Sequence, residues 1–306
     1  MDRDDYLLLA LLAGIWGASF LFIKIAVQEI PPISMVFLRT LAAAVAVAVY
    51  MRMSGVSIRG AMAKWKPGLV IAVLNAALPY VLIATSERHI DSSLAGILNA
   101  TAPIWTAVLA PVFAEAEQLH RRQGIGLGLG FVGVVILAYP SGSILDSNFL
   151  STLAVIAATL SYAVATHYSH RHFRDVSPQV PAFLQCALAA VILAPMALVV
   201  HPSHVPSLGA LAATLWLGVG ATGIAMVISF HLIKRIGAGR TIVVTYLLPP
   251  SALVWGFIFL HERPAPAVLV ALVMILAGVF FITARRATEA PGQVSEAAVV
   301  ESEAVA

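Results

Sequence analysis

Two apolar stretches of the sequence, residues 94–117 and 241–262, carry proline near their middle, Pro103 in the first and Pro249 with Pro250 in the second. Each stretch is about 20 residues long, which is the length that a helix needs to cross a bilayer. Proline leaves one backbone carbonyl without its helical hydrogen bond. A membrane tolerates this only where a neighbouring helix, a hydroxyl group or a water-lined cavity satisfies that carbonyl. The pair therefore predicts a polar site between helices.

Apolar stretches of this length make up most of the chain. Of its 306 residues, 60% are hydrophobic and only 11% are charged, unlike a soluble protein of this size. The expected spans are about 6–27, 33–53, 67–86, 93–114, 124–140, 149–170, 179–200, 208–233, 241–260 and 267–284. The sequence thus predicts an all-α membrane protein with ten transmembrane helices and no room for a soluble domain. The last residues, 287–306, are small and acidic, which predicts a disordered tail.

The basic residues predict the orientation in the membrane. Of the 18 lysines and arginines, 14 fall on the side of the N-terminus, 2 on the other side, and Lys24 and Arg39 within spans. Basic residues collect on the cytoplasmic side of membrane proteins. Both termini are therefore expected in the cytoplasm, with the chain as a multi-pass protein of the inner (plasma) membrane. The N-terminal residues MDRDD do not resemble a signal peptide, so we expect the first span to be retained.

An internal repeat divides the spans into two sets of five. Matched pairs 146 residues apart include Pro32 and Pro178, Phe37 and Phe183, Arg39 and Gln185, and Pro103 and Pro249. Because five is odd, the second copy must enter the membrane from the opposite side, which gives an inverted-topology repeat. The predicted units are residues 1–143 and 144–286, followed by the tail.

The motifs of the two halves resemble those of the EamA-type members of the drug/metabolite transporter superfamily, across nearly the whole chain. The matching residues are Trp16 to Ser19, Arg39, Pro103, Glu117 with Arg122 and Gln123, Gly133, Pro249, His261 to Arg263, and Gly278. The resemblance implies a carrier of the inner membrane, usually an exporter of amino acids, related metabolites or drugs. It also implies a central cavity near Pro103 and Pro249, and transport by alternating access.

Several residues are candidates for lining that cavity. Aromatic side chains well inside spans either fill the packing or line a cavity, and polar side chains beside an interrupting proline are favoured for the site. The candidates for substrate binding are Trp16, Arg39, Tyr80, Asn99, Trp105 and Tyr246, with helix breaks expected at Pro103 and Pro249.

Embedded charges limit the substrates and the coupling mechanism. Arg39 either binds substrate or extends to the membrane surface, whereas Lys24 is expected to extend to the surface. Glu117 and Glu262 are expected to be hydrated at the ends of their spans, in capping roles. No acid lies at mid-depth, so His167 and His231 are the candidates for a proton relay, unless transport is facilitated diffusion. A basic cavity favours neutral, zwitterionic or anionic solutes.

Glycines in the fifth span predict a second kind of feature, a helix packing face. Two overlapping small-residue patterns are formed by Gly124, Gly126, Gly128, Gly130 and Gly133. Small residues let the backbones of two transmembrane helices approach each other.

The sequence predicts a secondary transporter, not an enzyme. It holds no Walker A run, no HExxH, no Cys/His cluster and no GxSxG, so we expect neither a catalytic site, nor a metal, nor a cofactor. The expected partners are a small-molecule substrate and the lipid bilayer, not nucleic acid. The sequence leaves open whether the protein forms a homodimer. The alternatives are a carrier for nucleotide-sugar, lipid-linked or drug-like substrates, a membrane-embedded enzyme, and a non-transporting membrane subunit.

Overall fold

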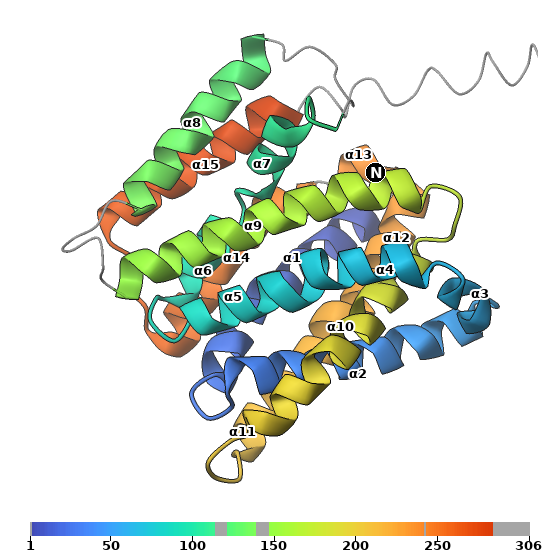
Figure 1. Ribbon diagram of the computed structural model, residues 1–306. Coiled ribbons are helices and arrows are strands. Elements are labelled where there is room, and N and C mark those ends of the chain that lie inside the picture. The colour runs from blue at the N-terminus through green and yellow to red at the C-terminus, as the bar shows by residue number, and fades with distance from the viewer. Residues whose placement is uncertain (1, 114–120, 139–146, 242, 284–306) are drawn as a thin grey trace, which may run out of the picture.

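The computed structural model describes residues 2–113, 121–138, 147–241 and 243–283, and its regular elements in these ranges are all helical (Figure 1). The all-α prediction is therefore confirmed for the described part of the chain. Glu117 and the predicted tail 287–306 lie outside the described residues.

The first half of the chain contributes eight α-helices and one π-helix. They are α1 (Arg3–Ala26), α2 (Pro32–Met53), α3 (Ile58–Met62), α4 (Trp65–Ala72), η1 (Val73–Ala77), α5 (Leu78–Ser86), α6 (Ser92–Asn99), α7 (Ala102–Leu109) and α8 (Arg121–Ala138). The second half contributes α9 (Ser147–His172), α10 (Gln179–Val199), α11 (Leu208–Gly218), η2 (Val219–Ile224), α12 (Ala225–Ile236), α13 (Ala238–Thr241), α14 (Val243–Leu260) and α15 (Pro266–Thr283).

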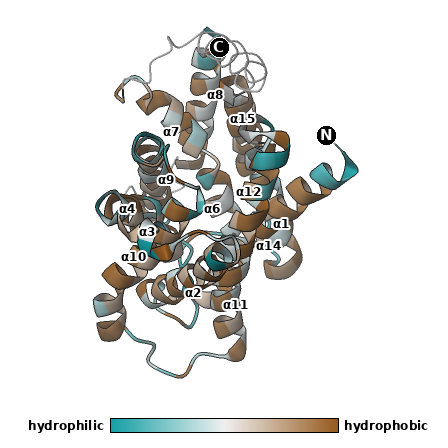
Figure 2. Ribbon diagram, turned by 90° about the vertical axis from the view of Figure 1, so that its right-hand side faces the viewer, coloured by the Kyte–Doolittle hydropathy of each residue, from teal (hydrophilic) through white to brown (hydrophobic). Residues whose placement is uncertain are grey.

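Nine helical segments of the described residues are long and apolar enough to cross a membrane, and α15 is apolar but shorter. Three of the nine segments consist of more than one helical element. The first is α4–η1–α5, the second is α6–α7, and the third is α11–η2–α12. Apolar residues dominate the helices in Figure 2. Many large apolar side chains on α2, α14 and α15, such as Val45, Phe257 and Val273, are exposed, as lipid contact requires.

Two π-helical segments occupy matching positions in the halves. Val219, the first residue of η2, lies 146 residues after Val73, the first residue of η1, which is the offset of the sequence repeat. A π-helical turn inside an α-helix is rare and is frequent at functional sites. Both segments therefore mark the region where a site is to be sought.

Helix contacts are paired in the same way. α1 packs against α14 and against α11 and α12, while α9 packs against α6 and α7 and against α4 and α5. α2 packs against α10, and α8 packs against α15 (Figure 1). Elements from the two halves thus interlock, and neither half forms a separate bundle.

The interrupting prolines behave differently in the two halves. α6 ends at Asn99 and α7 begins at Ala102, so the predicted break at Pro103 is present. α14, in contrast, continues through Pro249 and Pro250, and the predicted break at Pro249 is wrong. α14 packs closely against α1 and α6 along this stretch, because a side chain at Gly96 would collide with Ala252.

The α8–α15 contact is made through glycines on one face of α8. A Cβ atom at Gly126 would lie 2.6 Å from the backbone oxygen of Gly278, and one at Gly133 would lie 2.8 Å from Ile275. Gly124 and Gly128 have nothing within 4 Å of such an atom. Of the two predicted glycine faces, only the one containing Gly126 packs against a helix in the described structure.

This asymmetry predicts that Gly126→Leu destabilises the protein and Gly128→Leu does not. Overpacking of a close helix contact costs about 1–3 kcal/mol, whereas the exposed face of α8 accepts a larger apolar side chain. Thermal unfolding of the two purified variants in detergent measures the difference. Equal unfolding temperatures for both would show that the α8–α15 contact does not depend on Gly126.

Candidate functional site

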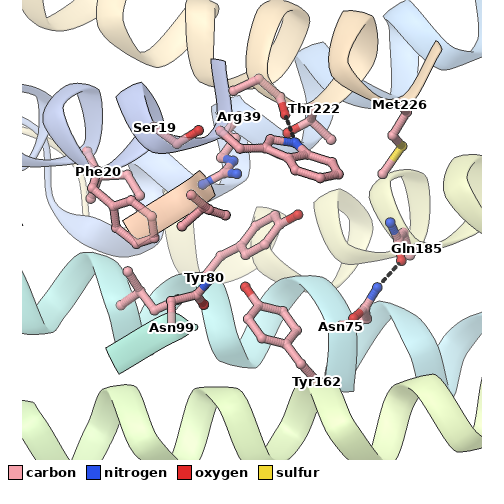
Figure 3. Close-up of a pocket in the computed structure, with 15 residues that line it drawn as sticks. Ser19, Phe20, Arg39, Asn75, Tyr80, Asn99, Tyr162, Gln185, Thr222 and Met226 are labelled. Atoms are coloured by element: carbon pink, nitrogen blue, oxygen red, sulfur yellow. Dashed lines mark hydrogen bonds between the residues drawn. The ribbon is translucent and has the colours of Figure 1, made fainter. Parts of the chain in front are cut away.

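A cavity of about 300 Å³ lies in the middle of the bundle (Figure 3). Its walls come from α1, α2, η1, α5, α6, α9, α10, η2, α12 and α14, so both halves build it. The polar and aromatic lining side chains are Trp16, Ser19, Phe20, Arg39, Asn75, Tyr80, Asn99, Tyr162, Gln185 and Thr222. We call this space the central cavity.

Arg39 is the charged member of the lining. Its side chain comes from α2, and its guanidinium carbon lies 4.0 Å from the centre of the Tyr80 ring. The residue is 8% exposed, and its Nε atom has no hydrogen-bond partner among the described residues. A buried guanidinium with an unused donor can bind an anionic group such as a carboxylate.

Aromatic rings form the walls beside Arg39. Tyr80 on α5 and Tyr162 on α9 meet edge to face with ring centres 6.5 Å apart. Trp16 on α1 is fixed by its indole N–H, which donates to the carbonyl of Ala221 in η2 at 3.1 Å. These rings offer apolar surface and a face for a cation, the usual complement to a small amphipathic ligand.

Polar amides complete the lining. The Asn99 side-chain oxygen is buried and has no hydrogen-bond partner in the described structure. Asn75 in η1 donates to the Gln185 side-chain oxygen at 2.6 Å, which links the third span to α10. An unused acceptor and an unused donor, on Asn99 and Arg39, thus lie in the same cavity.

Repeat-related residues meet in the central cavity. Four pairs that lie 146 residues apart line it: Trp16 and Tyr162, Arg39 and Gln185, Asn75 and Ala221, and Tyr80 and Met226. The sequence analysis missed Tyr162 as a lining residue. The repeat offset from Trp16 was the signal that would have found it.

The structure brings together four of the six candidate residues, namely Trp16, Arg39, Tyr80 and Asn99, and leaves two outside the central cavity. Tyr246 on α14 points to α15, where its hydroxyl donates to the carbonyl of Val279 at 3.2 Å. Trp105 on α7 does not line the cavity either. Leu248, two residues beyond Tyr246, takes the place on α14 that faces the cavity.

Neither candidate histidine lines the central cavity. His167 on α9 is 3% exposed, its Nε2 atom lies 2.9 Å from the carbonyl oxygen of Thr106, and its ring stacks on Phe113. His231 on α12 is exposed. His167 therefore contributes to packing between α7 and α9, and neither histidine is placed to pass a proton to a bound solute.

Ion pairs connect the halves at the end of the bundle that carries the N-terminus, which we call the basic end. Lys64 lies 2.7 Å from Asp175, and Arg235 lies 2.7 Å from Asp5. The hydrogen bond from Lys64 lowers the pKa of Asp175. A second hollow of about 490 Å³ lies at this end; it shares Asn75 with the central cavity and is also lined by His170 and Arg174.

Different contacts occur at the opposite end, which holds the turns 27–31, 87–91 and 200–207. Within the first half, the half-buried Lys24 ammonium donates to the carbonyls of Glu87 and Ile90 at 2.6 and 2.8 Å, so it bonds to the turn at this end. Glu29 accepts from the backbone N–H and the hydroxyl of Ser207, both at 2.6 Å.

Glu262 is also placed differently from the expectation. It was expected to be hydrated, but it is only 8% exposed. Its two carboxylate oxygens accept from the backbone N–H groups of Ser92 and Ser93 at 2.7 and 2.9 Å. A carboxylate at a helix N-terminus satisfies N–H groups that have no partner within the helix. Glu262 therefore caps α6, far away in the sequence.

A cavity with polar lining inside a bundle of apolar helices is the arrangement of a membrane transporter. Comparison with known families agrees with this class. The EamA-like transporter family model matches residues 5–139 and again residues 150–284. The chain belongs to this family, and the resemblance seen in its sequence is confirmed.

Individual relatives cover most of the chain at low identity. An uncharacterized transporter of Archaeoglobus fulgidus is 23% identical over 92% of this chain and 99% of its own length. A probable terminal-alkyne amino-acid exporter of Streptantibioticus cattleyicolor is 25% identical over 88% of this chain and 90% of its own. The uncharacterized inner membrane transporter YedA of Escherichia coli K12 is 23% identical, over 88% and 87%.

A chain of known crystal structure shares the fold. It superimposes with a TM-score of 0.65 at 18% identity, and the match covers 95% of this chain and all of that chain. The protein is thus a multi-pass membrane transporter of the EamA-like family.

The cavity geometry predicts which introduced cysteines react in a working transporter. In a Cys186→Ala background, Asn99→Cys should react with a water-soluble thiol reagent and Tyr246→Cys should react much more slowly, because only position 99 lines the central cavity. Labelling of whole cells followed by mass analysis measures both rates. Equal reactivity at the two positions would mean that the aqueous pathway also passes between α14 and α15.

Proposed function

We propose that this protein exports small zwitterionic metabolites, such as amino acids, by alternating access at the central cavity. The observation that carries the proposal is the buried Arg39 guanidinium, whose Nε atom lacks a partner in the described structure. A carboxylate is the ligand that matches this group in charge and geometry. The relative from Streptantibioticus cattleyicolor, named as a probable amino-acid exporter, supports the same substrate class.

The rest of the lining fits the other parts of such a solute. The Asn99 oxygen, which lacks a partner among the described residues, can accept a hydrogen bond from an ammonium group. The faces of Trp16, Tyr80 and Tyr162 supply apolar surface and attract a cation. A purely cationic solute would meet the positive Arg39 without a compensating carboxylate in the lining.

Cavity size argues against larger substrates. About 300 Å³ is at the lower limit for small-molecule sites. A nucleotide sugar carries a pyrophosphate and a second ring system, so it needs more room and more than one cation, but Arg39 is the one charged residue of the lining among the described residues. Lipid-linked and drug-like substrates fit a cavity of this size poorly for the same reason.

The contacts at the two ends support a rocking mechanism. The Asn75–Gln185 hydrogen bond separates the central cavity from the hollow at the basic end, while Lys24 joins α1 to the turn that follows α5 at the opposite end. Breaking one set while keeping the other would open the cavity to one side at a time. The helix pairing, the two π-helical segments and the four lining pairs at one offset all support ten spans in two inverted repeats.

We expect Arg39→Gln to lower transport of a zwitterionic amino acid at least about tenfold, because a charge-assisted hydrogen bond contributes about 1.5–3 kcal/mol. The assay is counterflow into liposomes that contain only the purified protein, with a substrate first found by a growth screen against toxic amino-acid analogues. Arg39→Lys, which keeps the charge but loses the planar guanidinium, should retain intermediate activity.

A matched control is available outside the cavity. Tyr246→Phe removes a hydroxyl that bonds to Val279 and should leave the apparent affinity for substrate unchanged. Unchanged transport in Arg39→Gln would remove Arg39 from the site and with it the argument for a carboxylate.

The bias of basic residues predicts that the basic end faces the cytoplasm. Reporter tags fused to the N-terminus and to the C-terminus should both be active only as cytoplasmic reporters. High activity of a periplasmic reporter at the C-terminus would contradict the proposal of ten spans.

A further inference from the structure

Glu87 is a buried carboxyl group that the proposed transport mechanism does not use. It is the first residue after the third span and is 0% exposed. Both of its carboxyl oxygens are buried without a hydrogen-bond partner in the described structure. A buried ionised carboxylate without partners is strongly destabilising, so such a group normally neutralises itself by binding a proton.

Charged groups around Glu87 come from several helices. Lys24 of α1, Glu262 after α14 and, more weakly, Arg39 of α2 act on it electrostatically. The Lys24 ammonium, however, bonds to the backbone carbonyls of residues 87 and 90, and no ion pair with the carboxyl group is present among the described residues. From its own turn, Arg88 and Asp91 are exposed to solvent.

The two buried glutamates at this end have opposite surroundings. Glu262 lies at the N-terminus of α6 and accepts two backbone N–H groups, which favours its charged form. Glu87 follows the C-terminus of α5, where the helix dipole disfavours a negative charge. Glu262 also acts electrostatically against ionisation of Glu87.

The protonation state follows from burial. Burial is the largest influence and raises the pKa of Glu87 well above its usual range, while Lys24 opposes this and Glu262 adds to it. In the conformation seen here, burial without a hydrogen-bond partner among the described residues therefore favours the neutral carboxylic acid form of this side chain.

Glu87 also lies next to the transport pathway. Ile23 and Ile83 line the central cavity. Lys24 follows Ile23 by one residue, and Glu87 follows Ile83 by about one helical turn. We expect opening of the cavity at this end to separate Lys24 of α1 from the 87–90 turn, because both border the cavity residues Ile23 and Ile83. That movement would bring water to the carboxyl group of Glu87.

We propose that Glu87 is the proton-binding site of this transporter. It takes up a proton from the outer solution as the end of the bundle that holds Glu87 closes. The inference rests on the proposed alternating-access function. On reopening, the proton passes from the carboxylic acid to water, and the hydrated carboxylate remains. External protons would thus favour closure of this end after substrate has left, and Glu87 would set the pH dependence of closure without carrying a net proton across the membrane.

The sign of the pH effect follows from linkage. The closed state binds one more proton than the open state at any pH between the usual carboxyl pKa and the raised value of the buried group. Closure is therefore favoured at low pH. The equilibrium constant for closure falls by at most about tenfold per pH unit as the pH rises through that interval.

The first test measures the proton directly and needs no substrate. Infrared spectra of the purified protein at neutral pH should contain the carbonyl stretching band of a protonated carboxylic acid. The band should be absent in Glu87→Gln and present in Asp91→Asn, an acid from the same turn. If the Gln variant does not fold, Glu87→Asp should shift the band. A band that is missing in the wild type, or that Glu87 substitutions leave unchanged, overturns the proposal.

The second test measures opening of the outer end. In a Cys186→Ala background, Ile83→Cys reports access to the cavity from outside, and its labelling rate should rise from about pH 5 to about pH 8. When Glu87→Gln is added to this variant, the labelling rate should stay low at every pH. When Asp91→Asn is added instead, the labelling rate should still rise with pH. The proposal is overturned if the labelling rate still rises with pH in Glu87→Gln. It is also overturned if the labelling rate changes with the sodium concentration at constant pH. Because neither test uses a substrate, a wrong substrate class does not affect them.

Discussion

A polar group inside an apolar helical bundle must find a partner or a ligand, and this requirement organises the whole protein. Most buried hydroxyl groups satisfy it locally, as Thr40 and Thr214 do by bonding to the carbonyl four residues earlier. A few buried groups do not. Among the described residues, the Arg39 Nε atom and the Asn99 oxygen lack partners in the central cavity, and the Glu87 carboxyl group lacks them just beyond it. Unsatisfied buried groups are rare in folded proteins, so the proposed substrate site and proton site rest on these positions.

The two halves supply similar frames and different chemistry. The π-helical segments and the paired lining residues repeat at one offset, so both halves contribute to the cavity in the same way. Arg39 and its counterpart Gln185 nevertheless differ, because only one of them carries charge. One half thus holds the guanidinium group on which the proposed substrate class rests, and the other supplies the amide that bonds to Asn75.

The two ends of the bundle are closed by different physical means. Exposed or half-exposed ion pairs such as Lys64 with Asp175 join the halves at the basic end, and such pairs contribute little because water competes for them. At the opposite end, Glu262 bonds to buried backbone N–H groups, and the half-buried Lys24 bonds to backbone carbonyls. Hydrogen bonds in such a network form and break together. This property fits the proposed mechanism, in which each end of the bundle alternates between an open and a closed state.

The sequence by itself determined the class of the protein, because continuous apolar stretches admit only helices in a bilayer, and the repeat made Gln185 the counterpart of Arg39 in the second half. It also identified Trp16, Tyr80 and Asn99 as candidates. Only the tertiary structure decided that Tyr246 points to α15, that α14 continues as one helix through Pro249, and that Glu87 and Glu262 are buried. The physical reason is that helical periodicity specifies a face of one helix, whereas the partners of that face depend on how distant helices pack.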